Sequence, residues 1–352
     1  QSHGARYRDR LVGTFGHVGA FSFCQDKIIS TGGEGGMVVT SDEAVWRTMW
    51  SLKDHGKSWE AVYEQEHPPG FRWLHESFGS NWRLTEMQAA IGRLQLGKLD
   101  AWEEMKAGVP AGLPILEVGP FFSPAFRRPQ ASVRYLDCLS TEAMKARADA
   151  LGGTPTVDVP EIDYVWTGQP YRELVDRKFP VIYTSHNIEH QPCLLTHLRD
   201  LESVLEDNGA VFLVVPDKRY CFDHFFPATT LAEVMEAWVE QKKKHRLSDI
   251  LEHLFFTAHN DPARHWRGDH GADRSLLPLA AGHHASFQAE VERYRTAGEY
   301  TDVHAWKFTP DAFAVLFDDL FSLKLTRLRV LRIYPTVKNS NEFYVVLVPG
   351  GA

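Results

Sequence analysis

Residues that could move a proton gather in Ser185–Pro192, which reads SHNIEHQP. His186 and His190 flank Glu189 there, and a histidine titrates near neutral pH, which suits it to take the proton of a hydroxyl group. The same letters fit H-x-x-E-H, a zinc-peptidase pattern that needs a helix presenting both histidines. This segment instead leaves a predicted strand, and a proline follows at once. We therefore expect no metal here, and either loop hydrogen bonding or a place beside the reacting groups.

Two further residues could orient a substrate. Asp217 follows a predicted strand in Val-Pro-Asp-Lys-Arg-Tyr, and His304 lies in Asp-Val-His-Ala-Trp. For both residues a structural reading stays open, as a loop-capping aspartate and a hydrogen-bonded buried histidine.

A second set of residues fits a nucleotide-binding edge. Glu117-Val-Gly119 ends a predicted strand over 114–118, and Asp137 ends the next one, 20 residues after Glu117. A glycine lets the backbone approach a cofactor closely, and a carboxylate at the second position can accept both ribose hydroxyls. Asp163, before a short strand at 164–166, is an adenine-side candidate. Structural roles remain open for both aspartates.

The elements that must position these residues alternate between strands and helices, which predicts an α/β fold with a doubly wound parallel sheet. Further strands are expected at 181–185, 210–216, 329–334 and 343–348. Between the first two, an amphipathic helix carries leucines and should end at Asn208-Gly209, a usual helix-ending pair. Residues 220–300 should form a mostly helical insertion.

From residue 115 onward the chain resembles class I, type-11-like S-adenosylmethionine (SAM) methyltransferases, on the motif at 117–119 and the S-H-x-x-E-H-x-P segment. The resemblance implies a Rossmann-like sheet whose last strand is antiparallel, SAM as methyl donor, and a small-molecule, nucleotide-sugar or glycan acceptor in polysaccharide biosynthesis. One departure is plain, because the usual G-x-G after the first strand is Gly-Pro-Phe-Phe here.

The first 100 residues contain other motifs, GAFSFCQDKIISTGGEGGM at 19–37 and GSNWRLTEMQAAIGRLQLGKLD at 79–100. They resemble the DegT/DnrJ-type sugar aminotransferases. The resemblance implies that Lys27 corresponds to the lysine that binds pyridoxal phosphate and that Asn81 reaches a neighbouring subunit's cofactor phosphate.

The family's other cofactor contacts precede this lysine, and only 26 residues precede Lys27 here. We expect an inactive remnant that holds pyridoxal phosphate only if another chain completes it. The alternatives are a retained aminotransferase activity and an oligomerisation module through which the chain pairs with itself or with a complete aminotransferase.

Composition sets outer bounds. The 352 residues carry a net charge of −8 without a basic domain, so nucleic acid is not an expected partner. No apolar run approaches the ~20 residues of a membrane span, and the four cysteines are too scattered for a zinc cluster or a disulfide scaffold. These features favour the cytoplasm. We expect an aminotransferase-like segment at 1–102, a linker at 103–113 and a methyltransferase domain at 114–352.

Overall fold

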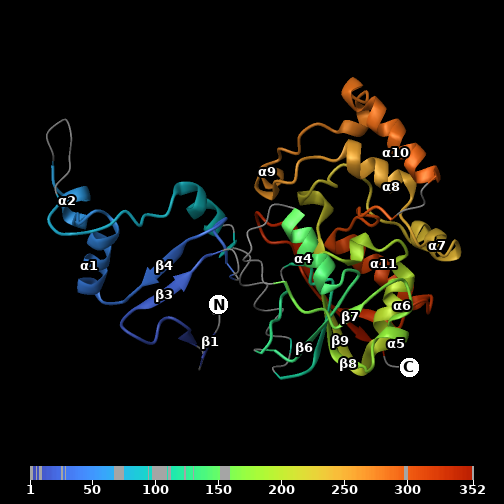
Figure 1. Ribbon diagram of the computed structural model, residues 1–352, viewed down its shortest axis with the longest axis horizontal. Helices are drawn as coiled ribbons and strands as arrows, with labels where there is room; N and C mark the ends of the chain where they lie inside the picture. Colours follow the sequence, from blue (N-terminus) through green and yellow to red (C-terminus); the bar gives the residue numbers. More distant parts are fainter. Residues whose placement is uncertain are drawn as a thin grey trace. The chain divides into compact units, whose positions relative to one another are not determined.

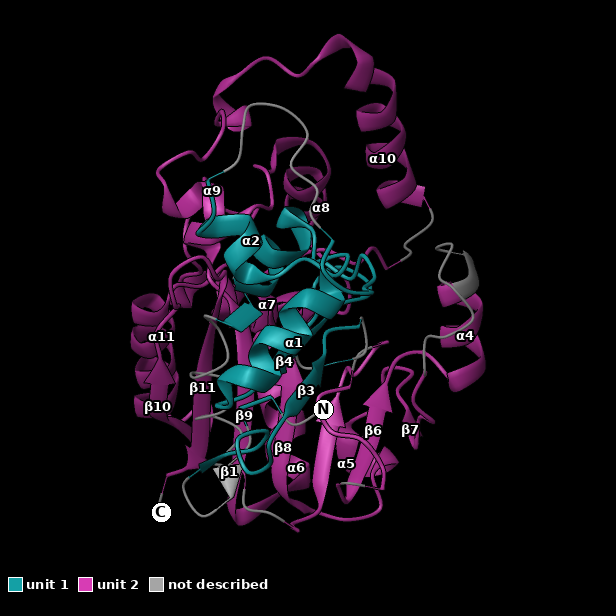
Figure 2. Ribbon diagram, turned by 90° about the vertical axis from the view of Figure 1, so that its left-hand side faces the viewer, with its two compact units in different colours: residues 1–103 teal, residues 104–352 magenta. Residues whose placement is uncertain are grey.

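The computed structural model describes residues 3–4, 6–7, 10–24, 27, 29–66, 75–93, 95–96, 109, 112–122, 124–129, 131–150, 159–296 and 300–350. The chain divides into two compact units, unit 1 at residues 1–103 and unit 2 at residues 104–352 (Figure 2). Among the described residues no helix is long and apolar enough to cross a membrane.

Unit 1 contains short antiparallel strand pairs and helices. The strands are β1 (Arg6–Tyr7), β2 (Arg10–Leu11), β3 (Gly19–Ser22) and β4 (Gly36–Val39), and β3 pairs with β4. Helices α1 (Glu43–Lys53) and α2 (Trp59–Tyr63) follow, and residues 86–93 are helical. That last helix begins with a capping box, because Gln88 Oε1 accepts from the Thr85 N–H at 3.1 Å and Thr85 Oγ1 accepts from the Gln88 N–H at 3.3 Å.

Unit 2 is built on a seven-stranded sheet in the order β10-β11-β9-β8-β5-β6-β7 (Figure 2). The strands are β5 (Ile115–Val118), β6 (Val133–Asp137), β7 (Tyr164–Val165), β8 (Phe179–Ser185), β9 (Leu205–Pro216), β10 (Leu328–Tyr334) and β11 (Glu342–Pro349). Strands β5 to β9 are parallel to one another, and β11 runs antiparallel to both β9 and β10. The predicted doubly wound sheet with an antiparallel last strand is confirmed.

Helices contribute apolar side chains to the core of unit 2. Those in the main core are α5 (Tyr171–Leu174), α6 (Leu194–Val204), α7 (Leu231–Val239) and α11 (Pro310–Ser322), while α4 (Thr141–Ala150) buries Met144 and Ala148. Leu198 of α6 and Phe317 of α11 are fully buried in one core with Ile182 of β8. Burying a side chain of this size contributes about 1.5–3 kcal/mol, so this core holds the strand ends in place.

The region 220–300 consists of short helices joined by turns. They are α8 (Leu247–Leu251), a π-turn (Glu252–Phe256), α9 (Pro262–Trp266), α10 (His284–Thr296) and two 3₁₀ turns, Arg274–Leu276 and Ala281–His283. Figure 1 shows α8, α9 and α10 together at one end of unit 2.

One predicted boundary is wrong. Helix α6 ends at Val204 rather than at Asn208-Gly209, because Leu205 is fully buried and already pairs with Phe179. Gly209 serves the strand instead, since a Cβ there would stand 2.9 Å from the carbonyl oxygen of Pro180. Burial of a large side chain outweighs the local helix-ending signal of an Asn-Gly pair.

Candidate functional site

The carboxyl ends of β5, β6 and β8 meet at one edge of the sheet. Val118 pairs with Leu136 on one side and with Thr184 on the other. The residues that follow these strands are therefore neighbours, and β5 and β8 flank the point where the strand order reverses. Ligands of open α/β sheets bind at such a point.

Glu117 organises the loop that leaves β5. Its carboxylate is buried and accepts hydrogen bonds from the backbone N–H groups of Ala125 at 2.6 Å and Phe126 at 3.1 Å. A buried carboxylate needs such donors. Glu117 therefore shapes the loop after β5 through its backbone.

Gly119 stands where this loop meets the segment after β8. Its φ is +71°, and a Cβ added there would lie 2.7 Å from Nδ2 of Asn187. Phe121 occupies the position of the second glycine in the usual motif and has a φ of +45°. A non-glycine residue in such a conformation costs on the order of 1–3 kcal/mol, so the departure from G-x-G keeps the turn at the expense of strain.

Asp137 ends β6 and is tied to the same loop. Its Oδ1 accepts from the Leu139 N–H at 3.0 Å and its Oδ2 accepts from the Phe121 N–H at 3.4 Å. Burial raises the pKa of Asp137, and these hydrogen bonds oppose that rise. Each carboxylate oxygen has two acceptor sites, so capacity for ribose hydroxyls remains.

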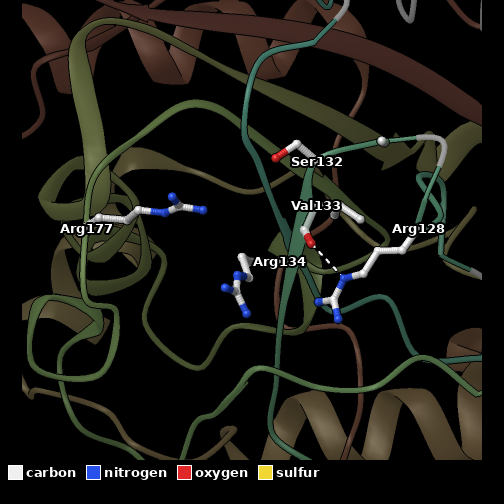
Figure 3. Close-up of a pocket in the computed structure, with 6 residues that line it drawn as sticks. Arg128, Ser132, Val133, Arg134 and Arg177 are labelled. Carbon is white, nitrogen blue, oxygen red and sulfur yellow. Dashed lines mark hydrogen bonds between the residues drawn. The ribbon is translucent and has the colours of Figure 1, made fainter.

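Asp163 does not join this group. It lies beside Tyr135, two residues before the end of β6, and accepts from the Tyr135 N–H at 2.8 Å. Its carboxylate also binds the guanidinium groups of Arg128 and Arg134. Those two arginines line a cavity of about 340 Å³ at the amino end of β6, together with Arg177 (Figure 3). These contacts favour a structural role, and the adenine-side role stays a prediction.

A buried carboxylate lies at the centre of the segment after β8. Glu189 sits in the 3₁₀ turn Ile188–His190 and is fully buried. Its Oε1 lies 3.4 Å from Nδ1 of His186, 3.7 Å from Nε2 of His190 and 3.9 Å from Nε2 of His304. The structure thus brings His304, which the sequence offered separately, to the segment that contains His186 and His190.

Each of these histidines has a second carboxylate on its other ring nitrogen. His186 Nε2 lies 3.0 Å from Glu342, His190 Nδ1 lies 2.9 Å from Asp302, and His304 Nδ1 lies 2.6 Å from Asp223. Sequence reasoning missed these three acids. They come from separate segments, and no spacing links them to the histidines before the chain folds.

The nearby carboxylates favour the protonated forms of His186 and His190. Desolvation acts to lower the pKa of His186, but Glu189 and Glu342 outweigh it and raise this pKa to about 10. Desolvation also lowers the pKa of His190, and Asp302 and Glu189 raise it above the usual value overall. His186 is therefore a cation that balances Glu189. His190 is the other histidine whose charged form these carboxylates favour, and its side chain is 25% exposed.

Residues 302–306 hold this cluster from the other side. The backbone N–H groups of Ala305 and Trp306 donate to the carbonyl oxygen of Glu189 at 2.8 and 3.2 Å.

Asp217 stabilises the loop around it. It is fully buried, its carboxylate forms a double ion pair with Arg219, and it accepts from Thr336 Oγ1 at 2.6 Å. These bonds shape the turn after β9, the loop-capping alternative that the sequence left open.

Glu189, His190 and His304 have ligand atoms close enough together to hold a metal ion.

In unit 1, Lys27 follows β3, and its N–H donates to the carbonyl oxygen of Cys24 at 3.0 Å. Asn81 forms an isolated bridge with Asp54 and accepts from Arg83 Nε at 3.1 Å.

Comparison with known proteins separates the two units. Residues 1–111 match the DegT/DnrJ/EryC1/StrS aminotransferase family. The chain is 37% identical over 111 residues to a dTDP-3-amino-3,4,6-trideoxy-alpha-D-glucose transaminase of Streptomyces venezuelae, covering 32% of this chain and 26% of that protein. It is 64% identical to a solved aminotransferase from Psychrobacter cryohalolentis, over 30% of this chain and 27% of that one, with a TM-score of 0.29. The chain spans about a quarter of the length of the curated relatives it matches.

Most of the chain aligns with methyltransferase structures. An S-adenosylmethionine-dependent methyltransferase from Clostridium acetobutylicum covers 71% of this chain and 89% of its own at 10% identity, with a TM-score of 0.34. The fold assignment rests on the strand order and the antiparallel β11, which are those of class I methyltransferases. The chain therefore combines an aminotransferase-family segment with a methyltransferase-like fold.

Proposed function

We propose that unit 2 transfers a methyl group from SAM to a hydroxyl group of a nucleotide-linked sugar or glycan. The observation that carries the proposal is the meeting of Gly119 and Asp137 with the segment His186–His190 at one edge of the sheet. The loop after β5, which would bind the methyl donor, is there next to the segment His186–His190, which would accept the proton. Aminotransferase-family relatives named for nucleotide-linked sugars support this acceptor class.

The residues divide the work between binding and proton transfer. When bound, SAM supplies an electrophilic methyl carbon, and transfer is an in-line displacement that requires the two reactants to be aligned. Asp137 would accept hydrogen bonds from the ribose hydroxyls of SAM, and Glu117 and Gly119 shape the loop that would bind it.

His190, whose side chain is 25% exposed, takes the proton of the acceptor hydroxyl. Asp302, 2.9 Å from its Nδ1, and Glu189, 3.7 Å from its Nε2, stabilise the cation that forms. The positively charged His186 balances Glu189, so the buried carboxylate does not compete for that proton.

The test is calorimetric titration of SAM into the full chain, followed by incubation with labelled SAM and a panel of nucleotide-sugars. We expect stoichiometric binding and label in at least one sugar. Absence of SAM binding would refute the proposed activity. Binding with no label in any sugar would refute the acceptor class alone.

Unit 1 supports a second candidate role, as a module that pairs two copies of this chain. Phe78, Trp82 and Met87 are 96%, 73% and 77% exposed, and all lie in or next to the family-matching motif at 79–100. Such large apolar side chains gain free energy when a partner covers them. The aminotransferase resemblance also implies pairing through this region. Light scattering on the full chain should give a dimer that becomes a monomer in Phe78→Asp/Trp82→Asp, and a monomeric parent would contradict this role.

A further inference from the structure

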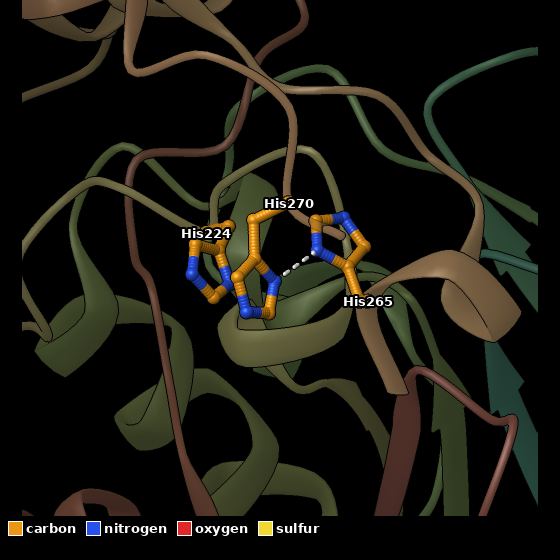
Figure 4. Close-up of side chains that lie close together, drawn as sticks. All are labelled: His224, His265 and His270. Carbon is orange, nitrogen blue, oxygen red and sulfur yellow. Dashed lines mark hydrogen bonds between the residues drawn. The ribbon is translucent and has the colours of Figure 1, made fainter. Parts of the chain in front are cut away.

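Three histidines of the insertion converge outside the candidate active site. His224 follows the 3₁₀ turn Lys218–Tyr220, His265 lies in α9, and His270 lies in the loop after α9. One ring nitrogen of each lies within 4.8 Å of the others. Figure 4 shows the three rings facing one another from these separate segments.

Backbone carbonyls fix the tautomers of two of these rings. His224 Nδ1 lies 2.7 Å from the carbonyl oxygen of Arg219, and His265 Nε2 lies 3.0 Å from the carbonyl oxygen of His259. A carbonyl oxygen only accepts, so both of these nitrogens carry the proton. His224 Nε2 and His265 Nδ1 therefore carry lone pairs that can accept a proton or bind a cation. Metal-bound histidines show this arrangement, in which the other ring nitrogen donates to a carbonyl or a carboxylate.

The third ring faces one of these lone pairs. Nδ1 of His270 lies 3.0 Å from Nδ1 of His265. Two ring nitrogens at this distance require a proton or a cation between them. Two nitrogen ligands of a tetrahedral zinc ion, each bonded at about 2.0–2.1 Å, stand about 3.3 Å apart, so the spacing matches neighbouring ligands of one ion.

His259 supports the cluster from outside. Its Nε2 lies 2.9 Å from the carbonyl oxygen of Asp269, and its Nδ1 accepts from the Asp261 N–H at 3.2 Å. Both of its ring nitrogens are thus used by the backbone. Trp266, next to His265, stacks on Tyr220 and donates to the carbonyl oxygen of Ser340 at 2.8 Å, which anchors α9 to the turn after β9. These contacts hold α9, and with it His265, in place without an ion.

We propose that His224, His265 and His270 bind one divalent transition-metal ion, with zinc as the best fit and the fourth position open to water or another ligand. Three imidazole nitrogens suit zinc and its transition-metal neighbours, whereas magnesium and calcium prefer oxygen ligands. Burial lowers the pKa values of His224 and His265, which favours their neutral, metal-binding forms.

The ion would join α9 to the turn that also carries Asp223, the partner of His304. The binding site itself does not depend on whether unit 2 transfers methyl groups.

The test is zinc titration by calorimetry of the chelator-treated full chain, with circular dichroism to check the fold of each variant. The parent should bind one equivalent. His270→Ala and His224→Ala, whose side chains are only partly buried, should weaken binding by more than about 100-fold, because loss of an outer-shell partner already costs 10- to 100-fold. His284→Ala is the matched control, an exposed histidine of the same insertion bonded to the Leu279 carbonyl oxygen, and should bind as the parent does.

A ligand exchange keeps the test independent of stability. His270→Cys loaded with cobalt should show a thiolate-to-cobalt absorption band that the cobalt-loaded parent lacks. A parent that binds no zinc, or a His270→Ala variant with parental affinity, would overturn the proposal. So would zinc that is lost in His190→Ala but kept in His270→Ala, since the ion would then belong to the cluster around Glu189.

Discussion

Unit 1 and unit 2 use their apolar side chains differently. Among the described residues of unit 1, the buried apolar side chains are Phe23, Ile29 and Ala61, while those of Phe78, Trp82 and Met87 face solvent. Unit 2 encloses a continuous core that runs from β5 to β11. Yet unit 1 is the part with clear sequence relatives, at 37% identity to a curated transaminase.

The unit with clear sequence relatives is therefore not the unit with the continuous apolar core. Unit 1 keeps the family's motifs, including Lys27 and Asn81, but much of its apolar surface is uncovered. Unit 2 has a complete sheet with converging polar residues at its carboxyl edge. A folded scaffold with a site is the better basis for proposing chemistry. Each prediction below would sharpen or break this contrast.

The largest effect is expected at Gly119. Gly119→Val should abolish SAM binding, because its Cβ would meet Asn187 at 2.7 Å and its φ of +71° is strained for valine. Gly168→Val is the matched control, since Gly168 also has a positive φ but has nothing within 4 Å of the added Cβ. Calorimetry measures both variants. Parental affinity in Gly119→Val would mean that this loop does not contact the donor.

The next effect concerns His190. His190→Ala should lower kcat by about 10²- to 10⁴-fold with SAM affinity retained, the usual contribution of a general base. His17→Ala, an exposed histidine of unit 1, is the control and should keep parental kcat. Steady-state rates with labelled SAM decide. An unchanged kcat in His190→Ala would show that another group removes the proton.

A smaller effect is expected at Asp137. Asp137→Ala should weaken SAM binding about 10- to 150-fold, because each charge-assisted hydrogen bond contributes about 1.5–3 kcal/mol. Lys27→Ala, in unit 1, should leave the affinity unchanged. A titration in which Lys27→Ala weakens binding as much as Asp137→Ala does would break the separation between the units.

The sequence predicted the sheet well because strand burial is a local pattern. The alternating strands and helices and the turn at Gly119 could be recognised from residues close together in the chain. The boundary of α6 could not, because Leu205 is drawn into β9 by its partner Phe179, 26 residues earlier in the chain.

The candidate site was predictable only in part. His186 and His190 stood in a recognisable segment, but their partners Glu342 and Asp302 come from distant parts of the chain. The cluster of His224, His265 and His270 escaped sequence reasoning for the same reason. Its members have no regular spacing, and only the fold of the insertion brings their rings together.

The smallest effect is a displacement of the pH profile, and it separates His190 from His186 as the base. Asp302 raises the pKa of His190 above its usual 6.5, so activity should fall as pH drops through a value above 6.5, where His190 becomes protonated. Asp302→Asn removes that charge, lowers the pKa and should move the acidic limb of kcat/KM to lower pH. Glu342→Gln, which removes the corresponding partner of His186, should leave the limb in place. If Glu342→Gln moves the limb and Asp302→Asn does not, then His186 takes the proton and the roles of the two histidines are reversed.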